Sequence, residues 1–269
     1  MDEPAPRDPD DVLISRRVDA PFAHLGEISR FVGRFFWEVV QPPYNVTEVV
    51  RLTYELGVKT LPLITLTGLI TGLVFTQQSR PSLASFGAES WLPSLVATGI
   101  VRSLAPLITA LLCAGKIGSS IGAELSSMKV TEQIEALEVS AVDPYRYLVV
   151  TRTVATTVSI PILTAYFGLV AFCGAYANVA LGDGMSWVAF IKSAFSVLEL
   201  LDVFGAAMRA VAFGFTIGIV SARAGFLAGA GTRGVGRAAN AAVVQAMIVI
   251  FLEEIFIVQI LTALRALGA

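Results

Sequence analysis

Five long apolar stretches, separated by short polar segments, dominate the pattern of positions along the chain. A helix needs about 20 mainly apolar residues to cross the hydrocarbon core of a bilayer. The third stretch is the clearest, because no residue from Thr153 to Gly182 is charged. The pattern predicts an all-α polytopic membrane protein whose five transmembrane helices lie near residues 60–79, 92–121, 147–180, 203–222 and 238–264.

Shorter amphipathic segments accompany the predicted spans. Residues 22–40 place aromatic side chains on one side and arginines on the other, which is typical of a helix that lies in the membrane interface. Pro42 and Pro43 end this helix, because proline lacks the amide hydrogen that a helix interior uses. We expect Tyr44 to Lys59 to form a helical elbow that leads into the bilayer. Trp187 to Leu201 is short and charged, and predicts an interfacial or re-entrant segment.

Composition supports the membrane assignment and narrows the function. Only 15% of the residues are charged, against about 25% in a soluble domain. The net charge of −2 gives no reason to expect a nucleic-acid partner. A single histidine, His24, leaves no histidine-rich metal site and no Ser-His-Asp arrangement, so we expect no catalytic residue, metal or cofactor in this chain. Cys113 and Cys173 lie in apolar stretches and are interpreted as small buried residues.

The charged residues are distributed unevenly. Residues 1–20 are acidic and proline-rich, the reverse of a signal peptide, and predict a disordered tail. With the N-terminus inside, five spans place 14 lysines and arginines on the inner side and only Arg80, Lys192 and Arg265 on the outer side. Because basic residues concentrate on the cytoplasmic side of membrane proteins, we expect a cytoplasmic N-terminus and an outer C-terminus.

Small residues recur at four-residue spacing within the spans, at Gly68 and Gly72 and again at Gly214 and Gly218. Such spacing allows two helices to approach closely. The pattern fits packing within one subunit as well as it fits a contact between subunits.

Four charged residues fall at similar depth on three spans: Arg102, Arg209, Glu253 and Glu254. Charges in lipid are costly, so they pair with one another or line a polar cavity. Two interpretations remain open here. One is a structural arginine–glutamate pair, and the other is a polar chamber, open outward, in which the arginines meet an anionic head group.

A polar segment between the second and third spans predicts a short amphipathic helix. Val130, Ile134 and Leu137 recur at positions i, i+4 and i+7 and form one narrow apolar face, and glutamates cover much of the rest. A short amphipathic helix held between two spans is suited to act on a partner outside the bilayer.

The same segment carries a resemblance to a known family. The residues that carry it run from Ala114-Gly115-Lys116-Ile117-Gly118 and Gly122-Ala123-Glu124-Leu125 through Met128-Lys129-Val130-Thr131-Glu132-Gln133-Ile134-Glu135-Ala136-Leu137-Glu138-Val139 to Val142-Asp143-Pro144. This sequence closely resembles the signature of the MlaE/YrbE permeases, the membrane subunits of Mce-type ABC transporters. The resemblance covers residues 21–269, which we interpret as one permease domain.

The resemblance implies partners and site residues. It implies a cytoplasmic ATPase subunit that binds ATP and magnesium, an MCE-domain protein on the outer side, and a second permease copy or paralogue in a bacterial inner membrane. Phospholipid or another hydrophobic lipid is the implied substrate. The implied coupling helix docks on the ATPase through Val130, Thr131, Glu132, Gln133, Ile134, Glu135, Leu137 and Glu138. The lipid-pocket candidates are Arg102, Arg209, Glu253 and Glu254.

The sequence differs from the family signature at one place, and two other classes of function remain as alternatives. Arg102-Ser103-Leu104-Ala105-Pro106 stands where many relatives have Arg-Glu-Leu-Gly-Pro, which removes any pocket contact made by that carboxylate. A secondary transporter or channel for a small solute is one alternative, although the two halves show no repeat of the kind such proteins carry. A membrane-embedded lipid enzyme is the other, and the shortage of acid–base or nucleophilic groups counts against it.

Overall fold

The computed structural model describes residues 26–42, 45–229 and 231–268 of the chain. The acidic tail predicted over residues 1–20 therefore lies outside the described residues. The chain divides into two units, Met1–Tyr44 and Asn45–Ala269.

The first unit contains one helix among its described residues, over 26–38. It lies within the amphipathic segment predicted over 22–40. Phe36 and Trp37 are 58% and 71% exposed on this helix, so it presents aromatic side chains outward, as an interfacial helix does.

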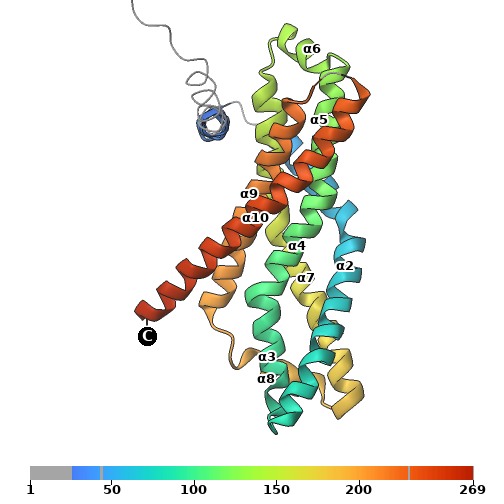
Figure 1. Cartoon of the computed structure of the whole chain (residues 1–269), viewed down its shortest axis with the longest axis vertical. Coiled ribbons are helices and arrows are strands. Elements are labelled where there is room, and N and C mark those ends of the chain that lie inside the picture. The colour runs from blue at the N-terminus through green and yellow to red at the C-terminus, as the bar shows by residue number, and fades with distance from the viewer. Residues whose placement is uncertain (1–25, 43–44, 230, 269) are drawn as a thin grey trace, which may run out of the picture. The chain divides into compact units, whose positions relative to one another are not determined.

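The second unit is a bundle of long helices (Figure 1). Five helical segments among the described residues are long and apolar enough to cross a membrane. They are Val46–Ser85, Glu89–Val130, Tyr145–Gly182, Leu200–Phe226 and Thr232–Ala263. The described residues contain no strand. The prediction of an all-α polytopic membrane protein is confirmed.

The elements of the bundle follow one another with short connections. The first segment is α2 (Val46–Ser85), and the second consists of η1 (Glu89–Trp91), α3 (Leu92–Gly99), η2 (Ile100–Leu104), α4 (Ala105–Cys113), η3 (Ala114–Gly118) and α5 (Ser119–Val130). After them come α6 (Gln133–Val139), η4 (Tyr145–Val150), α7 (Thr151–Asp183), α8 (Trp187–Phe195), α9 (Leu200–Phe226) and α10 (Thr232–Gly268). The elements η2, η3 and η4 are π-helical, a widened form that is frequent at functional sites.

The first span corrects one prediction, because residues 46–59 of the elbow expected over Tyr44 to Lys59 are the beginning of α2 itself, and Tyr44 lies outside the described residues. The buried positions of α2 explain its continuity. Leu52, Thr60, Ile64, Gly68, Gly72 and Thr76 are buried, and their spacing in multiples of four forms one stripe across the expected boundary. A single face therefore packs inward from the charged beginning of the helix to its apolar end, although Pro62 and Pro81 lie within it.

The segment predicted as interfacial or re-entrant over Trp187 to Leu201 contains α8, a helix of 9 residues. That length is far below the roughly 20 residues that a span needs. α8 packs against α3, where Ser94 Oγ donates a hydrogen bond to Ser193 O at 2.8 Å. It therefore closes the connection between the third and fourth spans without crossing.

Both small-residue motifs pack against α7 of the same chain. A Cβ added at Gly72 would lie 1.9 Å from Ala171 O, and one added at Gly218 would lie 2.6 Å from Thr153 Cα. Real Cβ atoms do not approach other atoms so closely, so the backbones of α2 and α9 touch that of α7. Of the two interpretations of these motifs, the structure shows packing within one subunit.

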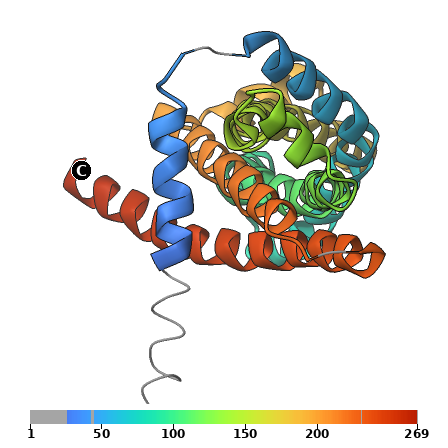
Figure 2. The ribbon, with the colours of Figure 1, turned by 90° about the horizontal axis from the view of Figure 1, so that it is seen from above.

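The bundle has two distinct ends (Figure 1). α6 lies at one, which we call the α6 end, and α3 and α8 lie at the other, the α8 end. The last helix, α10, runs along one side and continues past the other helices, as Figure 2 shows from above. Only 17% of the most apolar stretch of α10 is buried inside the protein, whereas 50% of the corresponding stretches of α7 and α9 is buried.

We expect Gly72→Val to destabilise the bundle, because its side chain meets the backbone of α7. Overpacking of a close contact costs about 1–3 kcal/mol. The matched control is Gly57→Ala in the same helix, where an added Cβ meets nothing within 4 Å. Thermal unfolding in detergent measures both. Equal melting temperatures for Gly72→Val and the native chain would contradict the contact.

Candidate functional site

The amphipathic segment at the α6 end is not the single helix that the sequence predicts. α5 ends at Val130, and α6 begins at Gln133. Between them Glu132 takes a left-handed conformation with φ of 59°, which breaks the helix because L-residues do not continue a right-handed helix there. The expected coupling residues therefore divide among α5 (Val130), the turn (Thr131, Glu132) and α6 (Gln133, Ile134, Glu135, Leu137, Glu138).

The apolar face of α6 turns toward its own chain, which corrects the expectation that it is the outward docking face. Ile134 is only 6% exposed, whereas Val139 is 89% exposed. Glu132, Gln133, Glu135 and Glu138 are exposed, and Leu137 is half-buried. The spacing placed Ile134 and Leu137 on one face of α6 but did not reveal that Val130 belongs to α5 or which side the face meets. The outward surface of α6 is therefore acidic, with one apolar side chain beside it.

Two contacts fix the ends of this segment to Phe226, the last residue of α9. Lys129 Nζ donates a hydrogen bond to Phe226 O at 3.1 Å. The ring of Tyr145 meets the ring of Phe226 edge-on, with centroids 6.3 Å apart. Tyr145 itself is placed by Asp143, whose Oδ1 accepts from the Tyr145 amide at 2.8 Å. The last residue of α9 thus touches the chain just before and just after α6.

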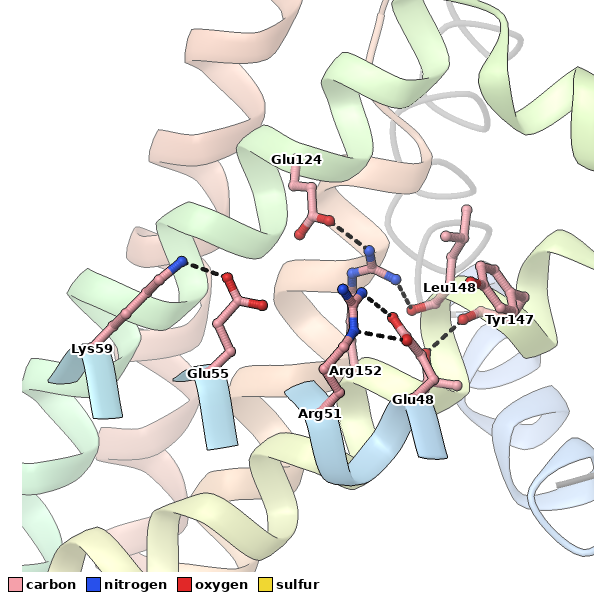
Figure 3. Close-up of polar contacts among 9 residues, drawn as sticks. Glu48, Arg51, Glu55, Lys59, Glu124, Tyr147, Leu148 and Arg152 are labelled. Carbon is pink, nitrogen blue, oxygen red and sulfur yellow. Dashed lines mark hydrogen bonds and ion pairs between the residues drawn. The ribbon is translucent and has the colours of Figure 1, made fainter. Parts of the chain in front are cut away.

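A buried arginine joins the two helices from which α6 extends (Figure 3). Arg152, only 5% exposed, forms an ion pair with Glu124 of α5 at 2.8 Å. Its Nη1 donates to Leu148 O in η4 at 3.2 Å. This pair was not among the residues predicted from the sequence. Its signal is the position of two opposite charges on either side of the polar segment, one in each flanking span.

Nearer the α8 end, three of the four charged residues expected at similar depth, Arg102, Arg209 and Glu254, come together, and Glu253 contacts Thr216. Arg209 Nη1 lies 3.0 Å from Glu254 Oε1 and also donates to Arg102 O. Thr216 Oγ1 donates to Glu253 Oε1. Three spans are therefore joined by polar contacts at this level.

Asp202 completes the cluster and was missed by sequence reasoning. Its carboxylate meets Arg102 through two contacts, Nε–Oδ1 at 2.6 Å and Nη2–Oδ2 at 2.9 Å. Asp202 also accepts from the Glu199 amide as part of a capping box that begins α9. The spacing Glu199 to Asp202 is the sequence signal for such a cap, but a residue at the edge of a span does not stand out as a charge in lipid.

Pro106 explains why the backbone carbonyl of Arg102 can accept a hydrogen bond from Arg209. In an α-helix this carbonyl would accept from the amide of residue 106, and Pro106 has none. The chain instead forms the π-helical η2 over Ile100–Leu104. The sequence that widens the second span therefore also provides an acceptor for an arginine of the fourth.

Two pockets lie side by side around this cluster and share Ala206. The first, of about 130 Å³, is polar, and its lining includes Arg102, Ser103, Asp202, Arg209 and Thr262. The second, of about 230 Å³, is apolar, and its lining includes Val101, Ala105, Gly168, Phe172 and Ala210. Each is smaller than the roughly 300–1,000 Å³ of a typical ligand pocket. The arginines are thus engaged in ion pairs and also border a small polar space, so features of both earlier interpretations are present.

Comparison with known proteins assigns this arrangement to a family. The family model of Permease MlaE matches residues 49–260. A Rickettsia typhi protein named "Probable ABC transporter permease protein" is 34% identical over 83% of this chain and 86% of its own length. Proteins of the same description from Synechocystis and Porphyra purpurea are 30% and 31% identical, over 84% and 74% of this chain and 86% and 76% of their own lengths.

We expect Arg209→Met to lower stability, because it removes the buried partner of the half-buried carboxylate of Glu254. Breaking a buried pair from one side costs about 3–5 kcal/mol. Replacing both partners, as in Arg209→Met with Glu254→Gln, should recover most of that loss. Thermal unfolding in detergent compares the single and double variants. A single variant as stable as the native chain would show that the pair does not hold the spans together.

Proposed function

Since this chain belongs to the MlaE permease family and is a transporter permease subunit, we propose that it moves a phospholipid or another hydrophobic lipid across or out of a bacterial inner membrane. A separate cytoplasmic ATPase, which binds ATP and magnesium, drives the transport. An MCE-domain protein on the outer side exchanges lipid with the permease, and a second permease copy or paralogue completes the membrane part.

The adjacency of the polar and apolar pockets carries the lipid proposal. A lipid has a charged or polar head group joined to apolar chains, and the two pockets meet at one residue, Ala206. Arg102 and Arg209 border the polar side, where a phosphate would find guanidinium donors. Alanine is the commonest residue on the apolar side, and the space of about 230 Å³ there would take part of an acyl chain. The two pockets together therefore match the chemistry of one amphipathic substrate.

The outward surface of α6 supports docking on a partner of opposite charge. Glu132, Glu135 and Glu138 are exposed there, and Val139 is almost fully exposed. We propose that the ATPase presents basic side chains to these carboxylates and an apolar hollow to Val139. Complementary charge of this kind accelerates encounter and fixes orientation. Ile134, which is buried, acts indirectly by holding α6 in place.

The orientation follows from the same proposal. An ATPase uses cytoplasmic ATP, so the α6 end lies in the cytoplasm and the α8 end faces outward. This agrees with the excess of basic residues that the sequence assigns to the inner side. The polar and apolar pockets then lie toward the outer side, where the MCE-domain protein is proposed to act.

We expect Ala206→Leu to reduce the lipid that co-purifies with the transporter, because the added side chain fills the boundary between the two pockets. The control is Val211→Phe on the same helix, since Val211 is 45% exposed and lines neither pocket. Mass spectrometry quantifies phospholipid bound to each purified complex. Undiminished lipid in a folded Ala206→Leu complex would refute the pocket assignment.

We expect Glu135→Lys with Glu138→Lys to weaken association with the ATPase by about tenfold or more, since like charges at an interface cost several kcal/mol. The matched control is Glu89→Lys, an exposed charge reversal at the opposite end of the bundle. Pull-down of the ATPase by each purified variant measures the effect. Equal recovery with all three chains would place the ATPase elsewhere.

A further inference from the structure

One helix connects the two regions described above. α9 ends at Phe226, which contacts Lys129 and Tyr145 on either side of α6. Near its other end α9 supplies Asp202 and Arg209 to the polar cluster. With 27 residues and a rise of 1.5 Å per residue, α9 spans about 40 Å. It is therefore a continuous rod between the proposed docking surface and the proposed lipid pocket.

The packing of α9 is tight at the α6 end. A Cβ added at Gly225 would lie 2.7 Å from Leu125 Cβ and 2.8 Å from Gly122 O, both in α5. A Cβ added at Gly118 of η3 would lie 2.9 Å from Ser221 Oγ of α9. An added side chain has no room between α5 and α9 there, so a displacement of one helix presses directly on the other.

The other end of α9 borders free volume. Asp202, Gly205, Ala206 and Arg209 border the polar pocket of about 130 Å³. Its contacts with the second and fifth spans include the ion pairs of Arg102 with Asp202 and of Arg209 with Glu254, and side-chain pairs can change partner or length more easily than a close backbone contact. A fully packed interior transmits a displacement of one helix to its neighbours. Side chains that border free volume, such as the polar pocket, can then rearrange in response.

We propose that Lys129 is a positioning residue that ties α9 to the α6 segment, so that a displacement of α6 reaches the ion pairs of Arg102 and Arg209. The inference rests on the proposed docking of an ATPase at α6. Lys129 Nζ holds Phe226 O, one of the last carbonyls of α9, and the positive charge also suits the negative end of the helix dipole. Tyr145 supports the same residue from the opposite side of the α6 segment.

A reporter in the polar pocket distinguishes this role from a merely structural one. Ser103 lines that pocket, and Ser103→Cys provides a thiol whose labelling rate reports access to it. Cys173, which is exposed, is replaced by alanine, while Cys113 is buried and stays. The rate is measured in the complete complex with its ATPase, with and without a non-hydrolysable ATP analogue.

The native chain should show a labelling rate that depends on the nucleotide. Lys129→Met keeps the length of the side chain but removes the donor, and should shrink the nucleotide effect by about 2- to 30-fold, the range in which single residues modulate coupling between sites. Lys129→Arg, which keeps a donor and a charge, should restore the effect. Lys192→Met, the same change at an exposed position of α8, should leave it unaltered.

Each other outcome overturns the inference in a distinguishable way. A full nucleotide effect in Lys129→Met, with the ATPase bound, would remove the role of Lys129 and leave the proposed function intact. A native complex without any nucleotide effect at position 103 would show that motion of α6 does not reach the pocket. Failure of the native chain to bind the ATPase would overturn both the inference and the proposed function.

Discussion

In a bilayer, apolar side chains gain little by leaving lipid for protein, so helices associate through close packing and polar contacts. The close packing in this chain centres on α7. Gly72 brings the backbone of α2 against it on one side, and Gly218 brings the backbone of α9 against it on another. The positions of the proposed docking surface and of the pockets depend on this arrangement, because both are built from helices that α7 holds in register.

Polar contacts then connect helices that the close packing has positioned. Two arginines, Arg209 and Arg152, make the same combination of contacts. Arg209 donates to the carbonyl of Arg102 in η2, and Arg152 donates to the carbonyl of Leu148 in η4. Each also pairs with a carboxylate of another helix. One guanidinium thereby satisfies a carbonyl of a π-helical segment and neutralises an acid, with its donors spread over a fork that lysine lacks.

The spans could be predicted because bilayer thickness sets a local requirement that a window of sequence either meets or fails. The beginning of α2 could not, since Glu48, Arg51, Glu55 and Lys59 are charged. In the structure they form pairs one turn apart, Glu48 with Arg51 and Glu55 with Lys59 (Figure 3), and such pairs support a helix. These charged residues mark where the apolar stretch begins, but the helix itself begins earlier, at Val46.

The candidate site was predicted in part for a similar reason. Arg102, Arg209, Glu253 and Glu254 stand out because charge in lipid is rare. Asp202 and the pair of Glu124 with Arg152 required knowledge of which residues meet across about 100 and 28 positions of sequence. The face of α6 was identified from spacing alone, but the side on which Ile134 is buried depends on the left-handed turn at Glu132, which periodicity does not reveal.

The separation of the partners in sequence has a consequence for synthesis of the protein. Arg102 leaves the ribosome 100 residues ahead of Asp202, a delay of roughly 5–20 s at translation rates of ~5–20 residues per second. During that interval the second span has already entered the membrane without the acid that neutralises its arginine. The long side chain of Arg102 must then reach toward the head groups, and it can turn inward only when the fourth span arrives. The order of synthesis therefore makes the arrival of the fourth span the step that neutralises Arg102, before the fifth span brings Glu254 to Arg209.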